Sequence, residues 1–198
     1  MNWCFTIALV LYYGLHSLLA STRVKHYLQQ RWVSARYYRL AYNGVAVLML
    51  LPVGYFYSTG EGQILLPQHW SHLVLGGLGF GFGLYLIRAA MQRYDWREFS
   101  GTAQLANPKG KVALGDLNTE GWNGVVRHPL YLGAITVAWS CVLLHPTALL
   151  LTAALVTTGY SYVGAKWEEA KLLAAFGDRY REYQKRVPML LPFPRLNS

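Results

Sequence analysis

The chain has few cysteines, few acidic residues and few long stretches of polar sequence. Its two cysteines, Cys4 and Cys141, both fall in apolar stretches, so they favour neither a disulfide framework nor a zinc site. They are interpreted as small apolar fillers. Residues 1–21 include an apolar run but lack the basic residues that begin a secretory signal. We therefore expect no cleaved signal peptide.

Apolar residues make up 54% of the chain, and its mean hydropathy is positive. A membrane-spanning helix needs ~20 mostly apolar residues. The stretches long enough, or nearly so, are 3–20, 38–57, 71–90, 130–145 and 147–165, of which the fourth is short. The sequence predicts an all-α polytopic membrane protein with about five transmembrane helices and a C-terminal helical extension. At 198 residues we expect one domain over 1–198.

The basic residues fall into three groups, within 23–39, 88–127 and 166–195. The N-terminus, the 58–70 loop and the His145-Pro146 turn have none. A net charge of +9 suggests nucleic-acid binding, but grouping in alternate loops is the pattern of the positive-inside rule. We therefore expect no nucleic-acid partner, an N-terminus outside the membrane and a cytoplasmic C-terminus.

Small residues in the third stretch predict close helix packing. They form two spacings, Gly77-x-x-x-Gly81 and Gly79-x-x-x-Gly83, which let helix backbones approach each other. A dinucleotide-binding fingerprint is rejected, because Phe82 stands where the third glycine is needed and no strand precedes it.

Several other residues carry expectations. Pro52 predicts a kink in the second stretch. An intramembrane histidine such as His16 is either functional or hydrogen-bonded within the bundle, and the sequence leaves both open. Residues 114–122 alternate apolar and turn residues, which indicates an ordered lid or a wall of a site. Asp178 predicts the N-cap of a further amphipathic helix. This helix is expected to lie on the bilayer with its aromatic residues inward, which is compatible with its closing over a site.

The most informative residues flank the fourth and fifth stretches. Arg127-His128-Pro129-Leu130-Tyr131-Leu132-Gly133 precedes them, and Glu168-Glu169 follows. At ~1.5 Å per residue, His128 and Glu168 lie ~27 and ~33 Å from the intervening turn. Both motif halves should therefore meet at one membrane boundary. Successive glutamates point about 100° apart, so one can face a site while the other pairs with a basic residue or with solvent.

Each motif residue also has an ordinary explanation. An Arg-His pair can anchor a helix at the interface, proline is common at the first helical position, and interfacial glutamates are often simply solvated. The joint occurrence, order and separation of the two halves favour a functional site over these explanations.

Together the halves resemble the signature Arg-His-Pro-x-Tyr-x-Gly … Glu-Glu of the integral-membrane S-adenosylmethionine-dependent methyltransferases. That superfamily includes isoprenylcysteine carboxyl methyltransferases and phospholipid methyltransferases. The preceding 119–126, with Trp122 where tyrosine is more common, and the segment 176–188 resemble its other conserved parts. The resemblance implies S-adenosyl-L-methionine as cofactor, held by about residues 114–192, and no metal.

The resemblance also implies roles for particular residues. It assigns catalysis to Arg127 and Glu168. The implied cofactor-binding residues are Gly121, Arg127, His128, Pro129, Tyr131, Glu168, Glu169 and Tyr180. It further implies a small or lipophilic methyl acceptor reached from the membrane lipid, and no obligate protein partner.

The N-terminal half resembles a narrower group. His16-Ser17-Leu18-Leu19-Ala20-Ser21 and Arg36-Tyr37-Tyr38-Arg39-Leu40-Ala41-Tyr42-Asn43 are similar to NnrU-type proteins and bacterial methanethiol S-methyltransferases. This favours a thiol acceptor, with carboxylate and amine still open, and a bacterial inner-membrane location. The alternatives are a haem-binding NnrU-like isomerase, with His16 and His72 as ligands, and a non-enzymatic membrane scaffold.

Overall fold

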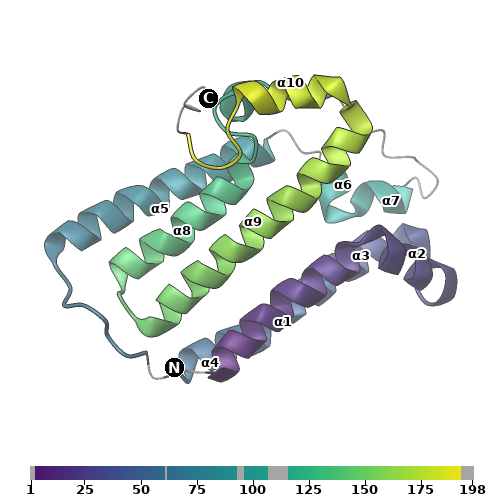
Figure 1. The fold of residues 1–198 in the computed structure, drawn as a ribbon. Helices are drawn as coiled ribbons and strands as arrows, with labels where there is room; N and C mark the ends of the chain where they lie inside the picture. Colours follow the sequence, from purple (N-terminus) through teal and green to yellow (C-terminus); the bar gives the residue numbers. More distant parts are fainter. Residues whose placement is uncertain (1–2, 61, 93–95, 107–115, 193–198) are drawn as a thin grey trace. The chain divides into compact units, whose positions relative to one another are not determined.

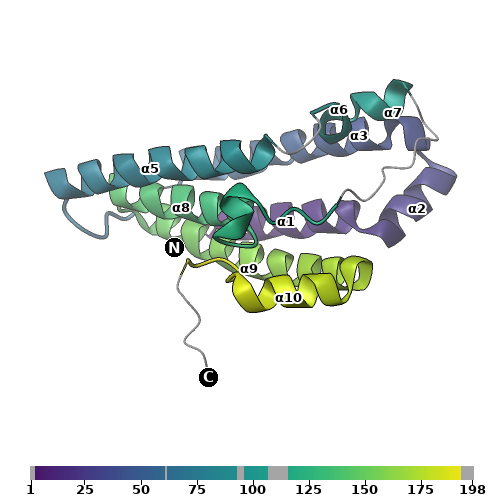
Figure 2. The same ribbon diagram turned by 90° about the horizontal axis from the view of Figure 1, so that it is seen from above.

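The structure is a computed structural model that describes residues 3–60, 62–92, 96–106 and 116–192. Helices dominate these residues, and their only β-pairing is an isolated bridge between Ile64 and Thr147. Figures 1 and 2 show the helices in two views. The chain divides into two compact units, residues 1–63 with 94–113 and residues 64–93 with 114–198. The single domain over 1–198 stays a prediction.

Four helices among the described residues are long and apolar enough to cross a membrane. They are α1 (Trp3–Ala20), the α3–α4 pair (Ala35–Leu48 and Leu50–Ser58), α5 (Trp70–Met91) and α9 (Ala148–Phe176). The fifth apolar helix, α8 (Pro129–Leu144), is shorter, as its sequence predicts. The all-α polytopic membrane fold is therefore confirmed, with four long helices and one shorter apolar helix among the described residues.

In the first unit, α1 packs against α3 and α4, and the short α2 (Thr22–Arg31) joins α1 to α3. The chain is interrupted at Met49, between α3 and α4. Pro52 has no N–H to donate to the Leu48 carbonyl, which explains a break at this point. Two short helices, α6 (Trp96–Ser100) and α7 (Thr102–Ala106), pack against α3. The Asn43 amide donates to the carbonyls of Phe99 and Ser100.

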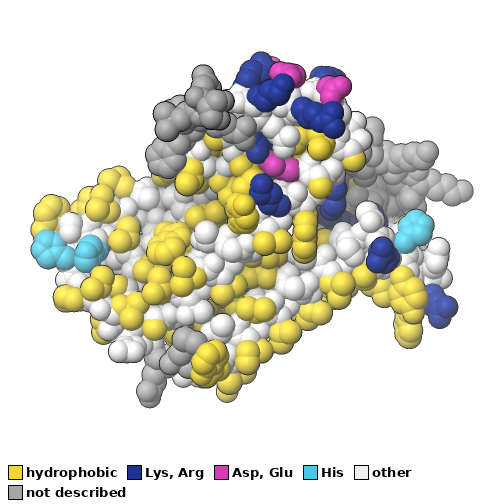
Figure 3. All heavy atoms as spheres, viewed as in Figure 1, with side chains coloured by type: hydrophobic (Ala, Val, Ile, Leu, Met, Phe, Trp, Pro, Cys, Tyr) yellow, Lys and Arg dark blue, Asp and Glu magenta, His cyan; other side chains and the backbone are white. Residues whose placement is uncertain are grey.

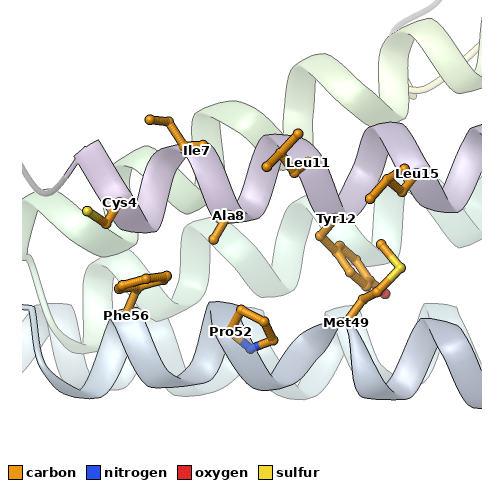
Figure 4. A pocket seen from close by; sticks show the side chains of 9 residues that line it. All are labelled: Cys4, Ile7, Ala8, Leu11, Tyr12, Leu15, Met49, Pro52 and Phe56. Atoms are coloured by element: carbon orange, nitrogen blue, oxygen red, sulfur yellow. The ribbon is translucent and has the colours of Figure 1, made fainter.

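An apolar groove of about 380 Å³ runs between α1 and α4 (Figure 4). Its lining residues are Cys4, Ile7, Ala8, Leu11, Tyr12, Leu15, Met49, Pro52 and Phe56. Its wall is almost entirely apolar, as expected of helices that face hydrocarbon.

In the second unit, α5, α8 and α9 lie side by side, and α8 is the middle helix (Figures 1 and 2). Glycines bring α5 and α8 together: a Cβ added at Gly83 would lie 3.0 Å from the Gly133 carbonyl oxygen, and one at Gly79 would lie 2.5 Å from a serine hydroxyl on α8. The packing predicted for the Gly79–Gly83 spacing is therefore confirmed. It is wrong for Gly77 and Gly81, which face open space, because they lie on another side of the helix.

Beyond α9, Gly177 adopts a φ of 54°, a conformation that glycine tolerates and other residues avoid. The short helix α10 (Asp178–Arg186) follows. The N-cap is Gly177 and Asp178 is the first helical residue, so the predicted N-cap at Asp178 is wrong by one position. Asp178 pairs with Arg181 one turn later.

The apolar face of α10 packs on the protein. Its buried residues Tyr180 and Tyr183, with Val187, form a cluster with partly buried apolar side chains. These partners are Leu117, Leu172, Leu173 and Phe176. The aromatic rings of α10 face α9 and Leu117, as the amphipathic pattern predicts; that the helix lies on the bilayer or closes over a site stays a prediction.

Candidate active site

The first motif half is held by the chain that follows α10. The Arg127 N–H donates to the Pro188 carbonyl at 2.9 Å, and the His128 N–H donates to the Met189 carbonyl at 3.2 Å. A 3-10 turn, η1 (Gly121–Gly124), leads into this segment. The C-terminal extension thus fixes the backbone at the start of α8.

The Arg127 side chain joins the two motif halves. It is 7% exposed, and its Nε donates to Glu169 Oε1 at 2.6 Å, with Nη2 also contacting that oxygen. Its Nη1 donates to the carbonyls of Gln184 and Val187. One guanidinium therefore ties α8, α9 and α10 together, which is the meeting of halves that the sequence predicts.

The two glutamates have different environments, as their angular offset on α9 requires. Glu169 is 7% exposed and also accepts a hydrogen bond from Gln184 Nε2 at 3.1 Å. The Glu168 side chain is 41% exposed, and its Oε2 lies 3.8 Å from His128 Nδ1. Glu169 is thus committed to an internal ion pair, whereas Glu168 presents a carboxylate to its surroundings.

His128 stands between these groups at the N-terminus of α8. It is buried, and its Nε2 lies 3.4 Å from Glu169 Oε1 but without the geometry of a hydrogen bond. Burial lowers the pKa of His128, and Arg127 lowers it further, against the opposing effect of Glu168 and Glu169. The imidazole is therefore neutral at pH 7, with one buried nitrogen not satisfied by the chain.

Three residues that sequence reasoning missed, Asn123, Tyr183 and Gln184, support the site. Tyr183 donates its hydroxyl to the Asn123 carbonyl at 2.6 Å, and Asn123 Nδ2 donates to the Arg127 carbonyl at 3.3 Å. Gln184 holds both members of the ion pair, through its amide and its carbonyl. The only available signal was their place inside segments that resemble the family. Burial raises the pKa values of Tyr180 and Tyr183, so both hydroxyls stay protonated.

The other predicted site residues lie around this centre. Pro129 is the buried first residue of α8, and the Tyr131 ring lies 5.6 Å from the His128 ring, centroid to centroid. Tyr180 is buried in the cluster under α10. Gly121 is exposed and forms the entry to η1 with a φ of 59°. Of the predicted wall over 114–122, residues 114–115 lie outside the described residues, and Leu117 packs beneath Tyr180 and Tyr183.

The histidines proposed as alternative ligands have contacts in separate units. His16 Nε2 lies 2.8 Å from the Tyr42 hydroxyl, and its ring stacks on Tyr12. Of the two possibilities left open for His16, hydrogen bonding inside the bundle is therefore observed. His72 lies on α5, where its ring contacts His69.

Known proteins similar to this chain share one class, the methyltransferases. The chain is 49% identical over 70 residues to methanethiol S-methyltransferase 1 of Bradyrhizobium diazoefficiens, covering 35% of this chain and 24% of that protein. It is 46% identical over 73 residues to methanethiol S-methyltransferase of Mycobacterium tuberculosis, covering 37% and 29%. For the enzyme of that name from Pseudomonas deceptionensis the identity is 42% over 119 residues, covering 59% and 44%.

The chain thus matches less than half the length of each of these relatives. No protein-family profile matches it. No solved structure matches it either. The predicted resemblance to membrane methyltransferases, and to methanethiol S-methyltransferase-like members in particular, is confirmed by these matches. The names of the relatives do not favour a haem-binding isomerase.

Proposed function

We propose that the chain is an S-adenosylmethionine-dependent membrane methyltransferase that acts on a small thiol. The observation that carries this proposal is the buried Arg127–Glu169 pair, which closes the two motif halves into one centre. The relatives named methanethiol S-methyltransferase support methyl transfer to a thiol. A carboxylate or amine acceptor has no comparable support.

The residues at this centre fit the cofactor. S-adenosylmethionine carries an ammonium, a carboxylate, ribose hydroxyls and an adenine. The half-exposed Glu168 carboxylate suits the ammonium or a ribose hydroxyl, since charge-assisted hydrogen bonds are the strong ones. The unsatisfied nitrogen of neutral His128 suits a hydrogen bond to another polar group, and the Tyr131 ring offers an apolar face. When bound, the cofactor supplies an electrophilic methyl group.

The residues of the chain contribute to such a transfer by positioning the reactants and by excluding water. A displacement at a methyl group needs the acceptor held in line and water kept away, more than acid–base machinery. The Arg127 guanidinium is occupied by Glu169 and two carbonyls. We therefore assign it a positioning role, holding α8, α9 and α10 in register, and leave Glu168 as the motif carboxylate that contacts the ligand.

We also propose that this centre faces the cytoplasm and that the N-terminus lies outside. The supporting observation is the distribution of Lys and Arg among the loops, because basic loops remain on the cytoplasmic side. The site residues lie at the end of α9 that carries Lys166 and Lys171, where the cofactor is available from the cytoplasm.

Cofactor binding is the first test. The full chain in detergent is titrated with S-adenosylhomocysteine by calorimetry, with Glu168→Gln and His128→Gln as variants. Each lost hydrogen bond to a charged or buried group is worth about 1.5–3 kcal/mol, so affinity falls at least about tenfold. Glu182→Gln, which changes an exposed glutamate on α10, is the matched control and keeps full affinity.

Folded wild type that does not bind the ligand would contradict the proposed class. Normal binding by both site variants would instead contradict only the residue assignment. The acceptor is tested separately, by following radiolabelled methyl from the cofactor into methanethiol, a small carboxylate and a small amine. Labelling of the thiol alone is expected. Labelling of the carboxylate or the amine in its place would overturn the thiol assignment.

A further inference from the structure

The helix α2 lies at a membrane surface because of what it connects. Its ten residues rise only about 15 Å, too short for a hydrocarbon core of ~30 Å. The helices on either side, α1 and the α3–α4 pair, are both long and apolar enough to span. A polar helix between two spans is thereby held at the boundary, and none of its residues is buried.

The charge around α2 is of one sign. Residues 1–60 contain no aspartate or glutamate, whereas residues 23–39 carry five Lys and Arg. Arg39 has a partner within its unit, since its Nε donates to the Phe99 carbonyl. Arg23, Lys25, Arg31 and Arg36 are exposed. Figure 3 shows basic, histidine and hydrophobic side chains together over α2.

Aromatic rings accompany these cations. Tyr27 and Trp32 are 53% and 78% exposed, and the Arg31 guanidinium lies 5.4 Å from the centroid of the Tyr27 ring. Tyrosine and tryptophan with a basic neighbour are the residues that settle at the headgroup level of a bilayer. On this helix Val24, Leu28 and Gln29 are half-buried and every other residue is exposed, so most of its surface can contact a partner.

We propose that this surface binds the headgroups of anionic phospholipids. The basic–aromatic surface is defined by Arg23, Lys25, Tyr27, Arg31, Trp32 and Arg36. Cations in a stretch of sequence that contains no acidic residue attract anionic lipid, and the exposed rings fit the boundary between headgroups and acyl chains. This lipid site lies outside the motif centre and is independent of the proposed methyl transfer.

The test compares lipids on the full chain in nonionic detergent. Binding of phosphatidylglycerol and phosphatidylcholine is measured by native mass spectrometry for wild type and for Arg23→Gln/Lys25→Gln/Arg31→Gln. Each basic residue near such a surface contributes about fivefold in affinity. The triple variant is therefore expected to bind phosphatidylglycerol on the order of 100-fold more weakly, with phosphatidylcholine binding unchanged.

The matched control removes the same charge elsewhere, in Arg179→Gln/Arg181→Gln/Lys185→Gln on the exposed side of α10, and should keep wild-type phosphatidylglycerol binding. Circular dichroism and the melting temperature establish that each variant is folded. Equal binding of both lipids by wild type would overturn the proposal. So would an equal loss in the α10 control, which would indicate net charge alone, or competition by inorganic phosphate, which would indicate a free-anion site. An α2 variant that does not fold is replaced by Arg23→Gln and Arg31→Gln singly, each expected to show about a fivefold loss.

Discussion

Substituting Glu169 with glutamine should destabilise the fold more than any other conservative change at the site. The substitution keeps the size of the side chain and removes its charge. Arg127, which is 7% exposed, then loses the carboxylate that balances it. The carbonyls of Gln184 and Val187 remain as acceptors for its Nη1, but they carry no full charge.

The magnitude follows from burial. Removing one partner of a buried ion pair costs about 3–5 kcal/mol, because the remaining charge is left uncompensated in a medium of low polarity. Since Arg127 retains two carbonyl acceptors, we take the lower end, about 3 kcal/mol. For a chain of this length, each kcal/mol shifts the melting temperature by roughly 2–4 °C. The expected decrease is therefore about 6–12 °C.

The assay is thermal unfolding in detergent without ligand, so that cofactor affinity does not enter. Glu168→Gln is the matched control: it makes the same chemical change one residue earlier, on a side chain that is 41% exposed. Its melting temperature should stay within about 2 °C of wild type, as for most exposed substitutions. The Glu169→Gln and Glu168→Gln variants therefore distinguish a loss of stability from a loss of cofactor binding.

A double-mutant cycle gives the sharper result. Arg127→Gln combined with Glu169→Gln should be more stable than the sum of the single effects by about 1–3 kcal/mol. A Glu169→Gln variant that melts with wild type would refute the reasoning, as would additive single effects. Either result would mean that the pair does not hold the two motif halves together.

Three further predictions concern other parts of the second unit. The pKa of His128 in the folded chain is below its ordinary value of 6.5, so as the pH falls below about 6.5 the unfolded chain takes up a proton at this residue before the folded chain does. The melting temperature should therefore fall as the pH decreases below about 6.5. The variant His128→Gln should show a weaker dependence on pH. Gly83→Ala places a Cβ 2.7 Å from a valine methyl on α8 and should cost about 1–3 kcal/mol of unfolding free energy, whereas Gly77→Ala, with nothing within 4 Å, should cost none. Tyr183→Phe removes the hydrogen bond to Asn123 and should cost about 1 kcal/mol, measured by chemical denaturation.

The sequence predicted the membrane fold well because its signals are long. Apolar stretches near the length of a bilayer leave helices as the only simple solution, and the turn at His145-Pro146 placed Arg127 and Glu169 at one boundary. The separation of 42 residues between these partners therefore carried structural information. Helix ends were also close to expectation, except that α9 continues to Phe176 rather than ending near 165.

The sequence did not predict which way individual residues face on their helices or which main-chain groups the side chains contact. It did not tell which glutamate faces Arg127, because both orientations of α9 agree with the apolar pattern. It assigned the wrong glycines together with the correct ones, since the face of α5 that meets α8 is set by the neighbouring helix. The Asn123 side chain donates to the main-chain carbonyl of Arg127, and the Arg127 side chain donates to the main-chain carbonyl of Gln184. Every residue type has a main-chain carbonyl, so the sequence does not reveal such contacts.

The unequal lengths of α8 and α9 make the motif centre sensitive to bilayer thickness. At ~1.5 Å per residue, the 16 residues of α8 rise about 24 Å, and the 29 residues of α9 rise about 43 Å. The first is shorter than a hydrocarbon core of ~30 Å, whereas the second extends beyond its apolar part into the polar turns that carry Lys166, Glu169 and Lys171. In a thicker bilayer the start of the short α8 is drawn toward the acyl chains, whereas the polar end of α9 resists entering them. Arg127 lies just before α8 and Glu169 lies on α9, so the ion pair that joins the two helices also bears the hydrophobic mismatch.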